Sequence, residues 1–299
     1  MENQFKNKGA KAQLASAMIL FGTIGIFVRN IDLPSSVIAM VRGFVGALFL
    51  FALIKGRNEE ISREDIERNK ISLIFSGGFL GINWILLFEA FRYTTLASAT
   101  LVYYLAPIIV IIVSAAFFKE SLEPLKVVCV GLALVGMVLV SGLLGNGLVN
   151  GTNIKGILFA LGAAVFYAAV ILVSQRLDSI SAYDGTIVQL AMSAVVLVPY
   201  TLLTRDFKNL RVGPSSLVSL IIVAIIHTGL AYALYFSALK KLKAQTIALY
   251  SYLDPLVAVI ASTVILKEQM TLMTLIGGLL ILGSTLLSEI LDRHKESFV

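Results

Sequence analysis

The amino-acid sequence predicts an all-α integral membrane protein, with ten transmembrane helices arranged as two inverted five-helix repeats around a central cavity. Hydrophobic residues make up 58% of the 299 residues and charged residues only 14%, whereas a soluble domain of this length needs more charge to keep its surface hydrated. The mean hydropathy is +0.91, and the apolar runs are long enough to cross a bilayer. The second half of the chain also repeats features of the first half.

Breaks that are charged or rich in glycine and asparagine divide the chain into ten apolar segments of about 17–25 residues, the length of a membrane-spanning helix. In chain order, these segments are residues 12–29, 36–54, 71–91, 98–118, 125–143, 156–174, 184–203, 215–238, 245–266 and 272–290. The longest polar connection, Lys55–Lys70 (KGRNEEISREDIERNK), is predicted to be a loop. The gap Gly142–Gly156 divides the chain into two predicted repeats, residues 1–145 and 146–299.

The first apolar segment has the charged start and apolar centre of a signal peptide. Because it also has a counterpart in the second half, we expect it to be retained as a spanning helix. The single cysteine, Cys129, lies in an apolar run. It cannot form an intrachain disulfide or a thiolate metal cluster, and we expect neither a bound metal nor a cofactor.

Lysine and arginine are distributed unevenly between the two sets of connections. If both termini are cytoplasmic, sixteen of these residues lie on the cytoplasmic side and seven on the outer side. Short cytoplasmic loops carry such an excess of positive charge, so we expect a multi-pass plasma-membrane protein with cytoplasmic termini. The net charge of +6 is therefore mostly a topology signal and does not indicate a nucleic-acid partner.

The internal repeat appears when the chain is shifted by 148 positions. The segment from Gly81 to Glu120 then falls on the segment from Gly229 to Glu268, and twelve of the forty positions are identical. The matches include a Tyr-Leu-x-Pro motif in the middle of a predicted span and a Lys-Glu pair at its end. Because each copy has five spans, the second copy must cross the membrane in the opposite direction. Inverted repeats of this kind are common in secondary transporters, which bind their substrate near the bilayer midplane.

The repeated motifs resemble the EamA-type branch of the drug/metabolite transporter superfamily. The first copy reads FEAFRYT, then YLAP, KE and VGLALVGMVLVSG, and the second reads FSAL, YLDP, KE and IGGLLILGS. The first span lacks the tryptophan that is common in that family. The resemblance implies a ten-helix bundle whose central cavity is lined mainly by spans 1, 3, 4, 6, 8 and 9, and which exports small metabolites or amino acids. It does not identify one substrate.

Two prolines occupy matching positions in the middle of their spans. Pro107 removes the hydrogen bond to the carbonyl of Tyr103, and Pro255 removes the one to the carbonyl of Ser251. A free carbonyl is costly in lipid, so each should face protein or a polar cavity. Both prolines are candidates for a gating role, and a simple packing kink is the alternative.

Asp254 lies near the centre of its span, where a carboxylate costs several kcal/mol, about 3 on insertion scales. We predict that it binds a proton or a cation, or that it makes a structural hydrogen bond. Tyr250 precedes it by four residues and should share its helix face. His227, at a similar depth in the preceding span, is its nearest expected partner, although a lone histidine is more often a packing residue.

Arg42 and Glu89 lie toward the outer ends of spans 2 and 3 and are candidates for an external gate. The alternative is an ordinary charge pair, or side chains that extend to the membrane surface. Glu120 and Glu268, in the repeated Lys-Glu pairs, are expected to mark the membrane interface. A further set of residues offers an aromatic lining capable of hydrogen bonding, suited to a substrate with an apolar or cationic part: Asn83, Trp84, Tyr103, Tyr104, Tyr167, Tyr232 and Tyr235.

The motifs of hydrolases and nucleotide-binding domains are absent: the sequence contains no HExxH, GxSxG or P-loop pattern. We therefore expect a non-enzymatic secondary transporter that exports small metabolites such as amino acids by alternating access, as a monomer or homodimer. Proton coupling is left open. A passive channel or a lipid flippase is the main alternative, and an intramembrane enzyme is the least favoured.

Overall fold

The computed structural model describes residues 2–118, 124–141, 151–204, 212–239, 241–242, 246 and 250–296, and in these ranges the chain is helical, with no β-strand. The elements are α1 (Glu2–Arg29), α2 (Ser35–Gly56), α3 (Arg63–Tyr93), α4 (Leu96–Tyr103), α5 (Ala106–Phe118), α6 (Pro124–Ser141), α7 (Gly151–Ser174), α8 (Ala182–Thr204), α9 (Pro214–Ala224), η2 (Ile225–Leu230), α10 (Ala231–Leu239), α12 (Leu253–Ile260), η3 (Ala261–Ile265) and α13 (Leu272–Glu296). The prediction of an all-helical protein is confirmed for this part of the chain.

Within the described residues, seven helical segments are long and apolar enough to cross a membrane. Three shorter apolar helices accompany them: Pro124–Val140, Leu253–Ile265 and Leu272–Ser288. Large apolar side chains are exposed on the outside of the bundle, among them Phe44, Phe75 and Leu203. On a soluble protein such patches would promote aggregation, whereas here they suit contact with lipid.

The helix α3 begins earlier than expected, at Arg63, inside the segment predicted to be a loop. The side chain of Ser62 accepts a hydrogen bond from the backbone N–H of Asp65 and caps the helix. Ion pairs one turn apart, such as Arg68 with Glu64 at 3.0 Å, support this exposed first part. The polarity of the segment therefore marks the surface position of the helix and not the absence of a helix.

Two spans are interrupted near their centres. The first break lies at Tyr104 and Leu105, between α4 and α5, and Pro107 follows in the first turn of α5, where its missing N–H costs no helical hydrogen bond. The second break lies at Tyr252, immediately before α12, so that Pro255 also falls in a first turn. The predicted freed carbonyl of Ser251 accepts a hydrogen bond from the hydroxyl of Tyr104, at 3.3 Å.

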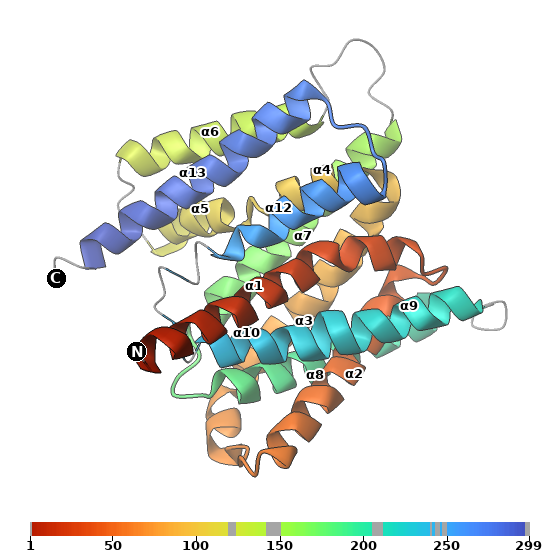
Figure 1. Cartoon of the computed structure of the whole chain (residues 1–299), viewed down its shortest axis with the longest axis vertical. Helices are drawn as coiled ribbons and strands as arrows, with labels where there is room; N and C mark the ends of the chain where they lie inside the picture. Colours follow the sequence, from red (N-terminus) through yellow and green to blue (C-terminus); the bar gives the residue numbers. More distant parts are fainter. Residues whose placement is uncertain are drawn as a thin grey trace.

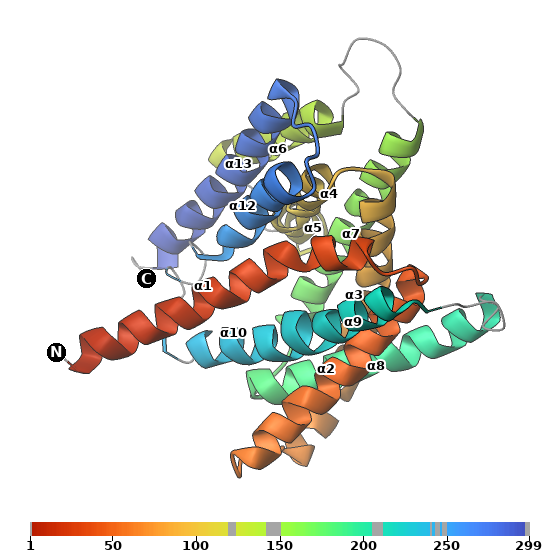
Figure 2. The same ribbon diagram turned by 45° about the vertical axis from the view of Figure 1, so that its right-hand side comes forward.

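The helices pack mainly across the two halves of the chain. The helix α3 of the first half packs against α7 of the second half, and α1 packs against α10 and α12 of the second half (Figures 1 and 2). The helices α2 and α8 form another pair, and α6 and α13 lie side by side (Figure 1). The start of α1 and the end of α13 lie at the same end of the bundle (Figure 1).

Small residues let helix backbones approach closely, and glycines in the motifs GTIG (residues 22–25) and SGGFLG (residues 76–81) allow the closest of these contacts. A Cβ atom on Gly22 of α1 would lie 2.5 Å from the carbonyl oxygen of Asp254 and 2.8 Å from the Cβ of Val257. A Cβ atom on Gly77 of α3 would lie 2.6 Å from the Cβ of Met192 in α8. These positions admit no larger side chain without a shift of the helices.

Candidate functional site

A cavity of about 500 Å³ lies between the two halves of the chain. Its walls come from α1, α2, α3, the α4–α5 span, α7, α10, the α12 span and α13. Nine of the residues selected from the sequence line it: Arg42, Trp84, Tyr103, Tyr104, Pro107, Tyr167, Tyr232, Tyr235 and Asp254. Side chains that are distant in the sequence thus meet around one space of a size that fits a small solute.

Asp254 lines the cavity from the second residue of α12. Its Oδ2 atom accepts a hydrogen bond from the hydroxyl of Tyr104, at 2.9 Å, across the interface between the two halves. The same hydroxyl is 3.3 Å from the carbonyl oxygen of Ser251. Tyr104 therefore joins the two helix breaks, and its ring places the hydroxyl beside the carboxylate.

Arg42 does not extend to the membrane surface but is buried, with 5% of its area exposed. Its Nε–H donates to the hydroxyl of Thr228 in η2, at 2.7 Å. Its Cζ atom lies 4.0 Å from the centre of the Trp84 ring, a distance typical of a cation–π contact. In the described part of the chain, no carboxylate lies within 4.0 Å of its guanidinium group.

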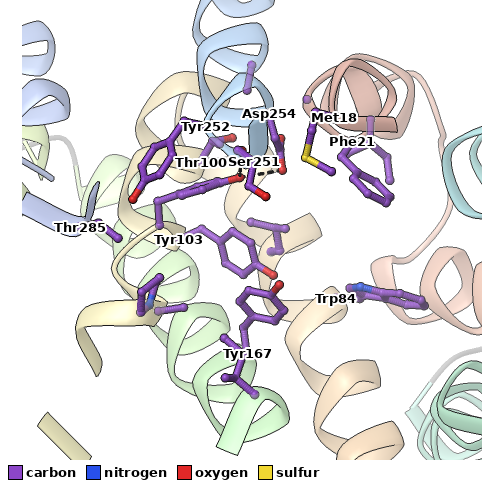
Figure 3. Close-up of a pocket in the computed structure, with 18 of the residues that line it drawn as sticks. Met18, Phe21, Trp84, Thr100, Tyr103, Tyr167, Ser251, Tyr252, Asp254 and Thr285 are labelled. Atoms are coloured by element: carbon purple, nitrogen blue, oxygen red, sulfur yellow. Dashed lines mark hydrogen bonds between the residues drawn. The ribbon is translucent and has the colours of Figure 1, made fainter. Parts of the chain in front are cut away.

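Aromatic rings occupy much of the remaining wall. Tyr103 stacks on Tyr167 with a centroid distance of 5.2 Å, and both rings reach into the space between Asp254 and Trp84 (Figure 3). Phe21 of α1 contacts Tyr232 of α10 edge to face, at 5.3 Å. The predicted aromatic lining is therefore present, and it combines apolar faces with phenolic hydroxyls.

Two predicted partners of Asp254 form no described hydrogen bond with it. His227 is the first correction: its Nε2 atom is 3.3 Å from the hydroxyl of Thr23, and its ring packs on Phe27. The π-helical segment η2 directs this side chain toward α1. Tyr250 packs against a cluster formed by Leu14, Ala17, Met18 and Ala238 and does not line the cavity. The break at Tyr252 interrupts the four-residue helical spacing on which the prediction rests.

Three further candidates also lie outside the cavity wall. Asn83 faces α7, where its amide group donates to the carbonyl of Ala163 at 2.7 Å. Glu89 pairs with Arg92 at 3.7 Å, one turn along α3. Pro255 is buried in the first turn of α12. In these positions, Asn83 contributes to helix packing, and Glu89 forms the expected local charge pair.

A charged cluster at one end of the bundle was not anticipated. Arg29, the last residue of α1, forms an ion pair with Glu268, which follows η3. The other oxygen of Glu268 accepts from the backbone N–H of Leu96, at 2.9 Å, and from the hydroxyl of Ser262. Arg29 also donates to the carbonyls of Phe91 and Thr94. Glu120 of the other Lys-Glu pair lies outside the described residues.

The Arg29–Glu268 cluster connects the end of α1, the turn between α3 and α4, and the end of η3. The sequence contained one signal for it, the repeated Lys-Glu pair. Glu268 stands in that pair, but the distant partner Arg29 cannot be identified from spacing alone.

Comparisons with known proteins agree with this architecture. The sequence profile of the EamA-like transporter family matches residues 12–142 and again residues 154–289. A Bacillus subtilis (strain 168) protein named "Uncharacterized transporter YxxF" is 30% identical over 292 residues, which cover 96% of this chain and 92% of the relative. A solved crystal structure shares the fold with a TM-score of 0.64, at 21% identity, and covers 97% of this chain and 99% of its own.

A relative with a named activity is more distant. The "Threonine/homoserine exporter RhtA" of Escherichia coli (strain K12) is 26% identical over 265 residues, which cover 87% of this chain and 84% of the relative. Since the family profile covers most of the sequence in two successive matches, and the helices are apolar enough to span a membrane, the chain belongs to the EamA-like transporter family.

Proposed function

We propose that this membrane transporter exports small metabolites, amino acids among them, by alternating access without hydrolysing ATP. The observation that carries the proposal is the cavity between the two halves, which is about 500 Å³ in volume and is lined by one buried cation, one carboxylate and several tyrosines. A site of this kind can hold a small solute with charged ends and an apolar body. The relative named as a threonine and homoserine exporter supports amino acids as the first solutes to test.

The proposed architecture is ten spans in two inverted five-helix repeats, residues 1–145 and 146–299, with cytoplasmic termini. If the two halves are equivalent, the contact of α3 with α7 corresponds to the contact of α10 with α1, and both contacts occur. The helix breaks at Tyr104 and Tyr252 are also equivalent under the shift of 148 positions. The two successive family matches support the same division, and the start of α1 and the end of α13 lie on one side, as an even number of spans requires (Figure 1).

In alternating access, the cavity opens to one side of the membrane at a time. The cluster of Arg29 and Glu268 joins α1 to the α3–α4 turn and to η3, so it holds one end of the bundle closed. A change to the opposite state requires these contacts to separate. The breaks in the α4–α5 and α12 spans supply places where the helices can bend.

Transport by purified protein in proteoliposomes tests the proposal. Labelled L-threonine should accumulate against its own gradient when a proton gradient is imposed, if transport is coupled to protons. Equilibration without accumulation would instead support a passive channel. The absence of flux for L-threonine, L-homoserine and a panel of other small metabolites would contradict the proposed activity, provided that the protein is correctly inserted.

A further inference from the structure

The guanidinium group of Arg42 is an unusual feature of the cavity. Arginine remains protonated in proteins, and a buried cation is normally paired with an anion. Arg42 is 95% buried from solvent, since only 5% of its surface is exposed, and it lines the cavity. Its described contacts are a neutral hydroxyl and two aromatic rings.

The orientation of this side chain is fixed by its surroundings. Thr228 accepts from the Nε–H of Arg42 at 2.7 Å, and its own hydroxyl donates to the carbonyl of Val223 at 2.9 Å. Gly46 lets α2 approach, because a Cβ atom there would be 2.6 Å from the Cγ2 of Thr228. Trp84 lies against the guanidinium group, with the ring centre 4.0 Å from Cζ.

These contacts leave the two terminal nitrogens of Arg42 without an acceptor among the described residues. Two terminal N–H groups of a guanidinium lie parallel and match the two oxygens of a carboxylate. The side-on arrangement that uses Nε is not available, because Nε–H already donates to Thr228.

We propose that Arg42, held by Thr228 and Trp84, binds the carboxylate of the transported solute end-on through its two terminal nitrogens. The proposal rests on the transport function above and specifies its substrate class as small organic carboxylates. A phosphate ester carries up to two negative charges, whereas the described cavity wall contains one cationic side chain. A singly charged carboxylate is therefore the better match.

The body of the solute would extend from Arg42 toward the tyrosines. Trp84 and Asp254 lie on separate walls, on α3 and α12, with Tyr103 and Tyr167 between them (Figure 3). An apolar or aromatic body can pack on these rings. Asp254 repels a second carboxylate near its own end, which favours monocarboxylates over dicarboxylates.

Trp84 supplies a direct measurement, because it is the single tryptophan of the chain and contacts Arg42. Its fluorescence can be recorded in the purified full-length protein while 4-bromobenzoate is added, since bromine quenches a nearby indole. The uncharged twin 4-bromobenzamide has nearly the same shape. We expect saturable quenching by the carboxylate and about tenfold weaker binding of the amide, the scale of one charge-assisted hydrogen bond. Inorganic phosphate should compete poorly.

Variants assign the effect to Arg42. Arg42→Gln should weaken binding of 4-bromobenzoate by about tenfold or more, and Arg42→Lys should restore part of it, because lysine keeps the charge but loses the planar pair of donors. Arg92→Gln is the matched control, since Arg92 lies on α3 beside Glu89 and outside the cavity wall. Size-exclusion chromatography confirms that each variant is folded.

Equal affinity of the wild-type protein for the two probes would overturn the proposal, and this comparison needs no variant. Unchanged binding by Arg42→Gln would also overturn it. Failure of the transport function gives a different result: the carboxylate still binds beside Trp84, but no solute crosses the proteoliposome membrane. Conversely, transport that proceeds equally with Arg42→Gln keeps the function and removes this site.

Discussion

The side chain of Asp254 has one described hydrogen bond, from the hydroxyl of Tyr104. A carboxylate can accept several donors, so its remaining lone pairs are free to bind a proton or a cationic group of a solute in the cavity. A carboxylate in the membrane interior is costly to keep. On the cavity wall, this carboxylate can bind a proton or a cationic group, which an apolar side chain cannot do.

Replacement of Asp254 by asparagine tests this role. Asp254→Asn keeps the size and an acceptor oxygen for Tyr104 but removes the titratable group. Transport should fall by about tenfold or more, because a hydrogen bond to a charged group contributes about 1.5–3 kcal/mol, and its dependence on pH should disappear. Proteoliposome flux across a range of pH values measures both. Asp32→Asn, at an exposed loop position, is the control. Wild-type pH dependence of transport by Asp254→Asn would exclude Asp254 from the mechanism.

For single residues, the sequence predicted cavity positions correctly where the residue type alone indicated them, and failed where a position depends on how two helices pack. Trp84 and five tyrosines lie on the cavity wall where they were predicted, and a sixth tyrosine of the wall, Tyr252, was missed. His227 and Asp254 do not meet, because similar depth along two spans says nothing about their rotation, and the π-helical turn changes that rotation. Arg42 was expected toward the membrane surface from its place in span 2, and its partner Thr228, 186 positions away, cannot be identified from the sequence.

At the scale of helices, the close contact of α1 with α12 positions Asp254. Gly22→Ala would place a methyl group within 2.5 Å of the carbonyl oxygen of Asp254. We expect a loss of about 1–3 kcal/mol of stability, the usual cost of overpacking, together with reduced transport. Thermal unfolding followed by size-exclusion chromatography measures the first effect.

Gly131→Ala provides the matched comparison for that substitution. Gly131 lies in α6, and a Cβ atom there would meet nothing within 4 Å. Alanine also has a higher helix propensity than glycine, so this variant should be as stable as the wild type or slightly more so. Equal stability of the two variants would contradict the importance of the α1–α12 contact.

The stability of the packing between the helix ends that Glu268 joins should depend on that side chain. Glu268→Gln weakens the acceptor that Arg29, Leu96 and Ser262 share. We expect a stability loss of roughly 2 kcal/mol, since hydrogen bonds to charged groups contribute about 1.5–3 kcal/mol. The melting temperature of the purified protein should fall accordingly.

Two further variants define the cause of that loss. Exchange of the two charges, in Arg29→Glu with Glu268→Arg, should not recover the stability, because a carboxylate at position 29 would face the carbonyls of Phe91 and Thr94 and a guanidinium at position 268 cannot accept from the N–H of Leu96. Glu64→Gln removes a pair with Arg68 that is exposed, with 85% of the Glu64 side chain accessible, and such pairs contribute little. A similar loss in Glu64→Gln would show that the Arg29–Glu268 cluster has no special role.

For the whole molecule, the proposed inverted arrangement makes a topological prediction. Glu59, between α2 and α3, and Val212, just before α9, lie in equivalent connections of the two halves and are both exposed. Single cysteines at these positions, in a Cys129→Ala background, should react differently with a membrane-impermeant maleimide on intact cells. Val212→Cys should be labelled and Glu59→Cys protected. Labelling of both from the same side would exclude the inversion.

Most of the fold could be predicted because hydropathy decides which segments enter lipid. The observed ends of α2, α6 and α8 lie within two residues of the predicted ones. The first turns of α3 were missed, because charged residues were interpreted as loop whereas they form the surface part of a helix. The cavity could be expected between repeats, but the pairs that shape it, such as Tyr104 with Asp254, join residues whose proximity depends on packing.

The packing of helices of the first half on helices of the second half has a consequence for synthesis in the cell. Because α1 packs on α10 and α12, and α3 on α7, a nascent chain that has delivered only its first five segments lacks the surfaces that those helices need. The side-chain amide of Asn83 would then lack the carbonyl of Ala163 in α7 to which it donates. A chain truncated near its middle would therefore not fold into a functional half-transporter, and we expect it to be degraded by membrane-protein quality control.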